Sequence, residues 1–205
     1  NWVTTMSAAT KVRPKSAKVP ASWTDLVAEA AKGKVTMPSP LYSGAAAIHV
    51  GTLTADKAFG WKYFETLARN GAVAVRGNGD VFKAVASGEK LYGVVVDFLA
   101  LREQAKGAPV TFVFPKEGVT AVTEPATILK TSKNQAVAKK FIDFLLSNAG
   151  LSLAASQGYL ALDKGIDPPK GFPKLDQIKL MNSDIPGIMK ADEANKKKFA
   201  ELFGG

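Results

Sequence analysis

The continuous apolar run Leu91–Val96 constrains the fold more than any other part of the sequence. A run of this length that is rich in β-branched residues is typical of a strand buried on both faces of its sheet. Helical patterns lie on either side of it, at Val81–Ala86 and from Asp97 to about Lys106. We therefore expect an α/β fold in which a mainly parallel sheet carries helices on both faces.

The same alternation of strands and helices continues through most of the chain. The other expected elements of the first part are a helix at 22–32, a strand at 34–37, a helix from 44, a helix at 59–69, a strand at 72–76, a turn at 77–80 and a strand at 110–114. The second part should hold an extended stretch at 119–130, an amphipathic helix at 134–147, a proline-rich connection at 165–173 and a final helix at 191–203. No repeat interrupts this order.

Composition excludes several classes of site. The chain has 205 residues, 46% of them hydrophobic, which is enough to bury a substantial core. It has no cysteine and one histidine, so disulfide scaffolds, thiolate metal sites and cysteine nucleophiles are excluded. The apolar runs are too short to cross a bilayer. We expect a globular protein that holds no metal and needs no cofactor.

The net charge is +9, from 27 Lys and Arg against 18 Asp and Glu. Such a surface suits an anionic partner, or only keeps the protein in solution. The densest basic runs, Lys11–Lys18 and Lys196–Lys198, contain no interleaved aromatic residues of the kind that bind single-stranded nucleic acid. We expect no nucleic-acid partner.

Candidate binding residues follow the expected strands, where ligands bind in open α/β sheets. The turn Tyr42–Gly44 leads into a helix that begins with Ser43, Gly44 and Ala45, and the free N–H groups of such a helix start attract anions. The alternative is an ordinary serine N-cap.

Three further polar residues each have two interpretations. Asn78 could donate its amide to a ligand or only form the turn at 77–80. Asp97 could receive an ammonium or hydroxyl group, and could also cap the helix that it begins. Glu124 could face a cleft from the extended stretch or lie on the surface.

Enzymatic motifs are lacking. His49 lies in an apolar helical pattern, no serine has a G-x-S-x-G turn, and there is no Walker loop or G-x-G-x-x-G. We expect no catalytic residue and no enzyme, although a hydrolase using Ser43 and His49 is kept as an alternative.

Several phrases, in this order and spacing, resemble one family of bacterial proteins. They are Val19–Leu26, Lys32–Val35, Met37–Pro40 with Ser43-Gly44, Val85–Glu89, Gly107–Val110, Pro115–Gly118, Ala138–Ser147 and Gln157–Leu160. The family is that of the bacterial extracellular solute-binding proteins for iron(III), phosphonates and organic phosphates, which have the type 2 periplasmic binding fold. The resemblance implies a periplasmic or lipid-anchored extracellular component of an ABC importer, which delivers a small ligand to its permease.

The resemblance also implies how the chain is divided. Residues 1–116 match the second lobe with its incoming crossover strand, 117–165 match a returning crossover and first-lobe segment, and 166–205 match a connection and helix that pack on the second lobe. The N-terminal part of the first lobe has no counterpart. We therefore expect a fragment that pairs with that segment or with a second copy of itself.

Within this family, Ser43, Gly44 and Ala45 match the helix start that binds a phosphate-like anion, and Asn78 matches a nearby polar contributor. Iron-binding members have two adjacent tyrosines where this chain has Asp97 and Phe98. The resemblance thus favours an aminoalkylphosphonate or a sugar phosphate, with the anionic end at the helix start and the other end near Asp97. Ferric iron is an alternative, and so is a polyamine held by Asp97.

Overall fold

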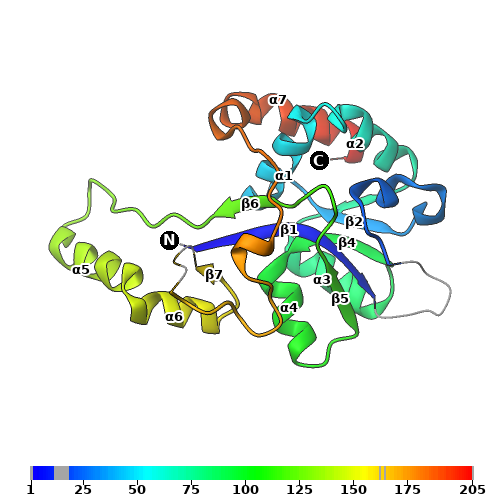
Figure 1. Cartoon of the computed structure of the whole chain (residues 1–205). Coiled ribbons are helices and arrows are strands. Elements are labelled where there is room, and N and C mark those ends of the chain that lie inside the picture. Colours follow the sequence, from blue (N-terminus) through cyan, green and yellow to red (C-terminus); the bar gives the residue numbers. More distant parts are fainter. Residues whose placement is uncertain (1, 12–18, 162, 164, 205) are drawn as a thin grey trace.

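The computed structural model describes residues 2–11, 19–161, 163 and 165–204 (Figure 1). The strands are β1 (Trp2–Lys11), β2 (Val35–Pro38), β3 (Val73–Val75), β4 (Tyr92–Val96), β5 (Val110–Val113), β6 (Thr120–Thr123) and β7 (Leu160–Ala161). The α-helices are α1 (Gly44–Ala55), α2 (Gly60–Arg69), α3 (Asn78–Ser87), α4 (Asp97–Ala105), α5 (Gln135–Leu146), α6 (Asn148–Ser156) and α7 (Ile185–Phe203). Three short 3-10 helices are η1 (Trp23–Val27), η2 (Glu29–Ala31) and η3 (Leu175–Gln177).

All seven strands belong to one sheet, whose central order is β3-β2-β4-β1-β5. β2 pairs in parallel with β3 and β4. β1 is antiparallel to all four of its partners, which are β4, β5, β6 and β7. Six strands therefore share one direction and β1 runs against them, so the α/β fold and its mainly parallel sheet are confirmed, with a reversed strand that the sequence did not predict.

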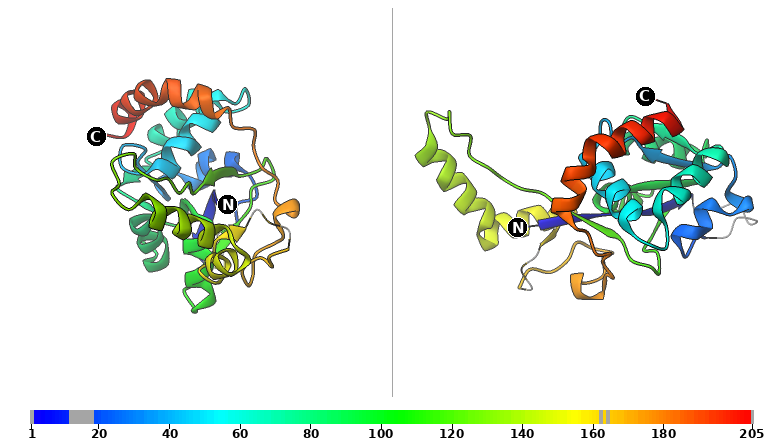
Figure 2. Two further views of the ribbon diagram at one scale, coloured as in Figure 1. Left: turned by 90° about the vertical axis from the view of Figure 1, so that its left-hand side faces the viewer. Right: turned by 90° about the horizontal axis from the view of Figure 1, so that it is seen from above.

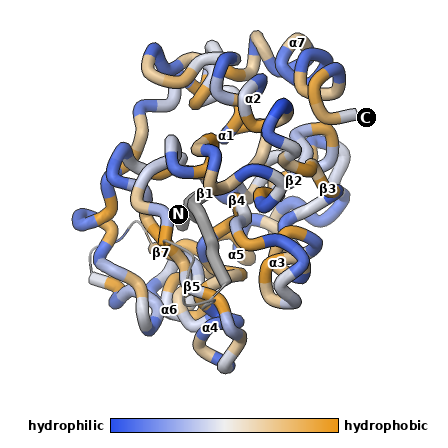
Figure 3. Tube along the Cα trace, turned by 90° about the vertical axis from the view of Figure 1, so that its right-hand side faces the viewer, coloured by the Kyte–Doolittle hydropathy of each residue, from blue (hydrophilic) through white to orange (hydrophobic). Residues whose placement is uncertain are grey.

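β4 is buried on both faces, as its composition predicts. Tyr92, Val94 and Val96 pack in the core cluster that also holds residues of α1 and α2. Val95 packs in a second cluster, with residues of α3, α4 and β5. A Cβ on Gly93 would lie 2.7 Å from Val81 of α3, so this helix packs directly on the strand. The tube of Figure 3 shows the hydropathy of these layers.

The final helix α7 packs beside α1 and α2 (Figure 1). Phe199 of α7 is fully buried and meets Phe64 of α2 edge to face, with ring centroids 6.3 Å apart. A Cβ on Gly51 of α1 would lie 2.6 Å from Ile188, so glycine permits the close approach of the two helices. We refer to α1–α4, α7 and β2–β5 together as the body.

The helices α5 and α6 form what we call the arm. In it, α5 extends away from the body (Figure 2), whereas α6 contacts β7 and buries Leu151 and Ala155. α5 has no buried residue, although its pattern is amphipathic as expected. Val137 and Phe141 are 67% and 59% exposed. Among the described residues, no helix is long and apolar enough to cross a membrane.

Three elements differ from their prediction. The helix expected at 22–32 is a pair of 3-10 turns, which separate at Ala28 because its backbone is extended. α3 begins at Asn78, inside the expected turn. α7 begins six residues before Ala191, because Asp184 caps it and Pro186 lies in its first turn. Of the basic run Lys11–Lys18, positions 12–18 lie outside the described residues.

Candidate functional site

The N-terminus of α1 opens toward solvent at the carboxyl end of β2. Ser43 is the N-cap, and its Oγ accepts a hydrogen bond of 3.3 Å from the backbone N–H of Ala46. Gly44 is exposed, and a Cβ there would meet no atom within 4 Å. The capping role that we weighed for Ser43 is therefore present. The space beside Gly44 leaves the helix start accessible to an anion.

Asn78 joins this helix start to the end of β4. Its Nδ2 donates to Ser43 Oγ over 3.3 Å, and its Oδ1 accepts from the backbone N–H of Val96 over 3.1 Å. One chain of hydrogen bonds thus links Ser43, Asn78 and Val96. These residues lie after β2, after β3 and at the end of β4, respectively. The sequence predicted Ser43 and Asn78 individually but could not show that they bond to one another, or that Asn78 bonds to Val96.

Asp97 follows β4 and is 1% exposed. It is the first residue of α4 and not its cap, since Val96 holds the N-cap position and makes no side-chain cap bond. The Asp97 Oδ1 instead accepts a 2.6 Å hydrogen bond from the backbone N–H of Phe98. The capping interpretation of Asp97 is therefore corrected, because the carboxylate lies inside the first turn.

Phe98 stacks on Tyr159, with ring centroids 4.7 Å apart and an angle of 25° between the planes. Tyr159 directly precedes β7, so this stack joins the start of α4 to the turn before β7. Burial raises the pKa of Tyr159, and the negative charges of Glu124 and Asp97 raise it further, while Arg102 opposes them. Two carboxylates therefore act on one phenol at this end of the sheet.

Glu124 follows β6. Most of the residue is exposed, yet partial burial of its carboxyl raises its pKa.

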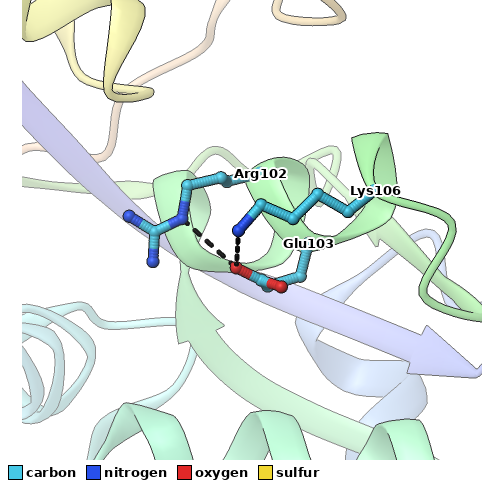
Figure 4. A network of polar contacts seen from close by, with 3 residues as sticks. All are labelled: Arg102, Glu103 and Lys106. Carbon is cyan, nitrogen blue, oxygen red and sulfur yellow. Dashed lines mark hydrogen bonds and ion pairs between the residues drawn. The ribbon is translucent and has the colours of Figure 1, made fainter.

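Arg102 lies one turn along α4, with its guanidinium 5.8 Å from the centre of the Phe98 ring. Arg102 and Lys106 both pair with Glu103, at 3.3 and 3.0 Å (Figure 4). These pairs lower the pKa of Glu103, the hydrogen bond from Lys106 most of all.

Tyr42 lies in a neighbouring pocket of about 400 Å³, whose lining includes Ser39, Arg76 and Phe203. The residue is 61% exposed, and the guanidinium of Arg76 lies 5.4 Å from the centre of its ring. The sequence did not single out Arg76, Arg102 or Tyr159 as site residues. Of these three residues, only Arg76 has a signal in the sequence, because it directly follows an expected strand.

His49 is packed in the core. It is 1% exposed, its ring lies 4.8 Å from that of Trp23, and its Nδ1 is 3.2 Å from Thr120 Oγ1. Burial lowers its pKa to about 3, so the ring is neutral at ordinary pH. Its hydrogen-bond partner is Thr120 and not Ser43, which leaves the hydrolase alternative without a serine–histidine pair. Among the described residues, no three His, Asp or Glu side chains gather as a metal site.

Comparison with known proteins identifies the family. The sequence profile of the family described as bacterial extracellular solute-binding proteins matches residues 1–180. The chain belongs to this family. The fold and the family are those of binding proteins rather than of enzymes.

Solved structures agree with this assignment. The periplasmic binding protein AfuA from Actinobacillus pleuropneumoniae, solved with exogenous fructose-6-phosphate, is similar with a TM-score of 0.87 and 23% identity. That similarity covers 98% of this chain and 67% of AfuA. The apo ferric ion-binding protein A of Pasteurella haemolytica has a TM-score of 0.78 and 22% identity over 98% of this chain and 67% of its own. Because both identities are below 25%, these similarities establish the fold alone.

A curated protein of Haemophilus influenzae, described as uncharacterized, is 29% identical over 175 residues. The match takes in 82% of this chain and 50% of the relative. The chain thus spans about half the length of the curated relative that it matches.

Proposed function

We propose that the protein is the substrate-binding component of an ABC importer and captures a small anionic solute. The observation that carries this proposal is the Asn78 bridge, which places the donor-rich start of α1 and the buried Asp97 at the same edge of the sheet. The start of α1 suits an anionic group, since its N–H groups and dipole favour negative charge. The carboxylates of Asp97 and Glu124 suit hydroxyl or ammonium groups at the other end of the ligand.

A sugar phosphate or an aminoalkylphosphonate has both kinds of group. The solved complex of AfuA with fructose-6-phosphate supports the first of these, because AfuA shares the fold over 98% of this chain. The ligand residues of this proposal are Ser43, Gly44 and Ala45 at the anionic end, with Asn78 and Tyr42 beside them, and Asp97, Phe98 and Glu124 at the other end.

The family description supports a periplasmic or lipid-anchored extracellular location and a cognate ABC permease as partner. We also propose the lobe division 1–116, 117–165 and 166–205. In this arrangement, the apolar side chains of α5 pack against a further first-lobe segment or a second copy of the chain, because a patch of exposed Val137, Phe141 and Phe144 favours a partner. Native mass spectrometry of the purified protein tests this packing. A measured mass equal to that of the single chain would contradict it.

Isothermal titration calorimetry tests the ligand. Fructose 6-phosphate, 2-aminoethylphosphonate and inorganic phosphate are titrated into the protein and into Ser43→Asp, which places a negative charge at the start of α1. We expect Ser43→Asp to lose at least tenfold in affinity for whichever compound binds. The control is Ser152→Asp, the same change at an exposed position of α6, which should bind as the wild type does. Unchanged binding by Ser43→Asp would reject the anion site.

Ferric iron is a second candidate, because Tyr159 stacks on Phe98 and so lies near Asp97, the residue beside Phe98 in the sequence. A phenolate and carboxylates are hard oxygen ligands of the kind that bind such a cation. Addition of a ferric salt would then produce a visible charge-transfer band that Tyr159→Phe removes. Binding of putrescine, weakened by Asp97→Asn, would instead support the polyamine alternative.

A further inference from the structure

A pocket of about 490 Å³ lies beside α4, and we call it the α4 pocket. Its walls come from three segments that are far apart in the sequence. These are the second half of α4, the end of α6 with the turn after it, and residues 167–172 of the proline-rich connection. Asp97, Phe98 and Tyr159 do not line it. The α4 pocket is therefore separate from the solute site proposed above, and its volume is typical of pockets for small organic molecules.

The apolar wall of the α4 pocket is held in place by the core. Leu101 packs against the second core cluster, beside α3 and β5. Phe172 packs against a separate cluster around β7, and Ala155 of α6 is buried. Pro168 and Pro169 complete this wall, and their rings restrict the backbone there. The pocket therefore offers a preformed apolar surface, which suits a flat or branched hydrocarbon group.

The polar part of the lining is mainly basic. It consists of three cations, Arg102, Lys106 and Lys170, and one carboxylate, that of Asp167. A second carboxylate, that of Glu103, pairs with Arg102 and Lys106 at 3.3 and 3.0 Å without lining the pocket. These five side chains together leave one positive charge in excess. The α4 pocket therefore favours a ligand that carries a single negative charge.

Arg102 keeps hydrogen-bond donors that Glu103 does not use. Glu103 Oε1 accepts from Nε of Arg102 and from Nζ of Lys106. Figure 4 shows both bonds reaching this one oxygen, while the two terminal nitrogens of the guanidinium point away from it. In the part of the chain that the structure describes, no other group bonds to these two nitrogens. A guanidinium in this state can bind both oxygens of a carboxylate.

We propose that the α4 pocket is a second binding site, which takes a small apolar monocarboxylate such as an aromatic acid. The carboxylate binds the terminal nitrogens of Arg102, and the charge of Lys170 adds to the attraction. The apolar part of the molecule packs against Leu101 and Phe172. Because the walls belong to α4 and to the connection, a bound molecule holds these two segments together. This site does not depend on the function proposed above.

Calorimetry at low ionic strength with 1-naphthoate tests the proposal, because this probe joins one carboxylate to a flat apolar ring system. The control probe is 1-naphthamide, which has nearly the same shape and no charge. We expect one 1-naphthoate to bind per chain, and 1-naphthamide to bind about tenfold more weakly because it cannot pair with the cations. Equal affinity for the two probes would overturn the role of the cations, and no binding of either would reject the site.

Reversing one charge tests whether the basic side chains of this pocket are the ones that attract the probe. Lys170→Glu should weaken the binding of 1-naphthoate about tenfold, because it replaces the excess positive charge by a negative one. The matched control is Lys190→Glu, at an exposed position of α7, which lies far from α4 (Figure 1). It should bind as the wild type does. Equal losses in the two variants would contradict the proposal, because they would reflect net charge alone.

Filling the pocket tests its position. Ala105→Trp places an indole ring among the lining residues and should abolish the binding of 1-naphthoate. Gln104→Trp is the matched control, since Gln104 is an exposed neighbour on α4 that does not line the pocket. It should bind normally. Full binding by Ala105→Trp would place the probe elsewhere, for example on the exposed side chains of α5, and would overturn the proposal. The melting temperature of each variant shows whether the fold is kept.

Discussion

The body and the arm place their phenylalanines in opposite surroundings. Phe64 and Phe199 of the body are fully buried and meet edge to face across α2 and α7. Phe141 and Phe144 of the arm are 59% and 43% exposed and stack mainly on one another, with centroids 6.5 Å apart. The body therefore contains its own hydrophobic core. The apolar side chains of α5, in contrast, are not buried by any part of the described chain.

The largest expected effect is at the centre of the body. Phe64→Ala should lower the free energy of unfolding by about 3–5 kcal/mol, because it removes a fully buried ring and leaves a cavity. Urea denaturation measures the loss. The matched change on the arm, Phe144→Ala, should cost less than about 1 kcal/mol. Equal losses at the two positions would remove the distinction between body and arm.

Acid should act on the body through His49, which is the single histidine of the chain. Burial lowers its pKa to about 3 in the folded state, against about 6.5 in the unfolded chain. Between these values the unfolded chain binds the extra proton, so stability falls as the pH falls below about 6.5, by about 3 kcal/mol at pH 4. Chemical denaturation over this range should give a shallower slope for His49→Gln. An identical slope would show that folding does not lower the pKa of His49.

Close packing of α3 on β4 gives the next effect. Gly93→Ala should destabilise by about 1–3 kcal/mol, because the new Cβ would lie 2.7 Å from Val81 and 2.8 Å from Val85. Gly79→Ala in α3, where a Cβ meets no atom within 4 Å, is the control and should be neutral or stabilising by up to about 1 kcal/mol. Thermal unfolding compares the two variants. An unchanged melting temperature for Gly93→Ala would show that Val81 and Val85 can move to accommodate the new methyl group.

The smallest effect is expected on the arm itself. Phe141→Ser should change the free energy of unfolding by less than about 0.5 kcal/mol, since the ring is mostly exposed. It should also reduce the binding of a dye that reports exposed apolar surface. A loss above about 2 kcal/mol would instead mean that the arm is covered in solution, which would support the packing that we propose for α5.

Local patterns predicted the elements that local physics decides. The β-branched run at β4 and the serine at the start of α1 were both identified correctly from the sequence. The early start of α7 was not predicted, although Asp184 and Pro186 are residues typical of a helix start.

Contacts between distant segments could not be predicted in this way. The stack of Phe98 on Tyr159 joins α4 to the turn before β7, and no spacing in the sequence encodes it. The Asn78 bridge also depends on three strand ends that meet only in the folded sheet. The ligand roles of Ser43 and Asp97 stay predictions until binding is measured.

The reversed strand β1 has a consequence for the order in which the chain assembles. The residues that pair with β1 lie between Tyr92, which pairs with Thr10, and Ala161, which pairs with Trp2. As the chain emerges from the ribosome, β1 must wait for residues far downstream before it can form these pairs. Bringing such distant segments together costs loop-closure entropy and slows folding. Until β4 has emerged, β1 has none of these partners, and its edges are open to pairing with other chains.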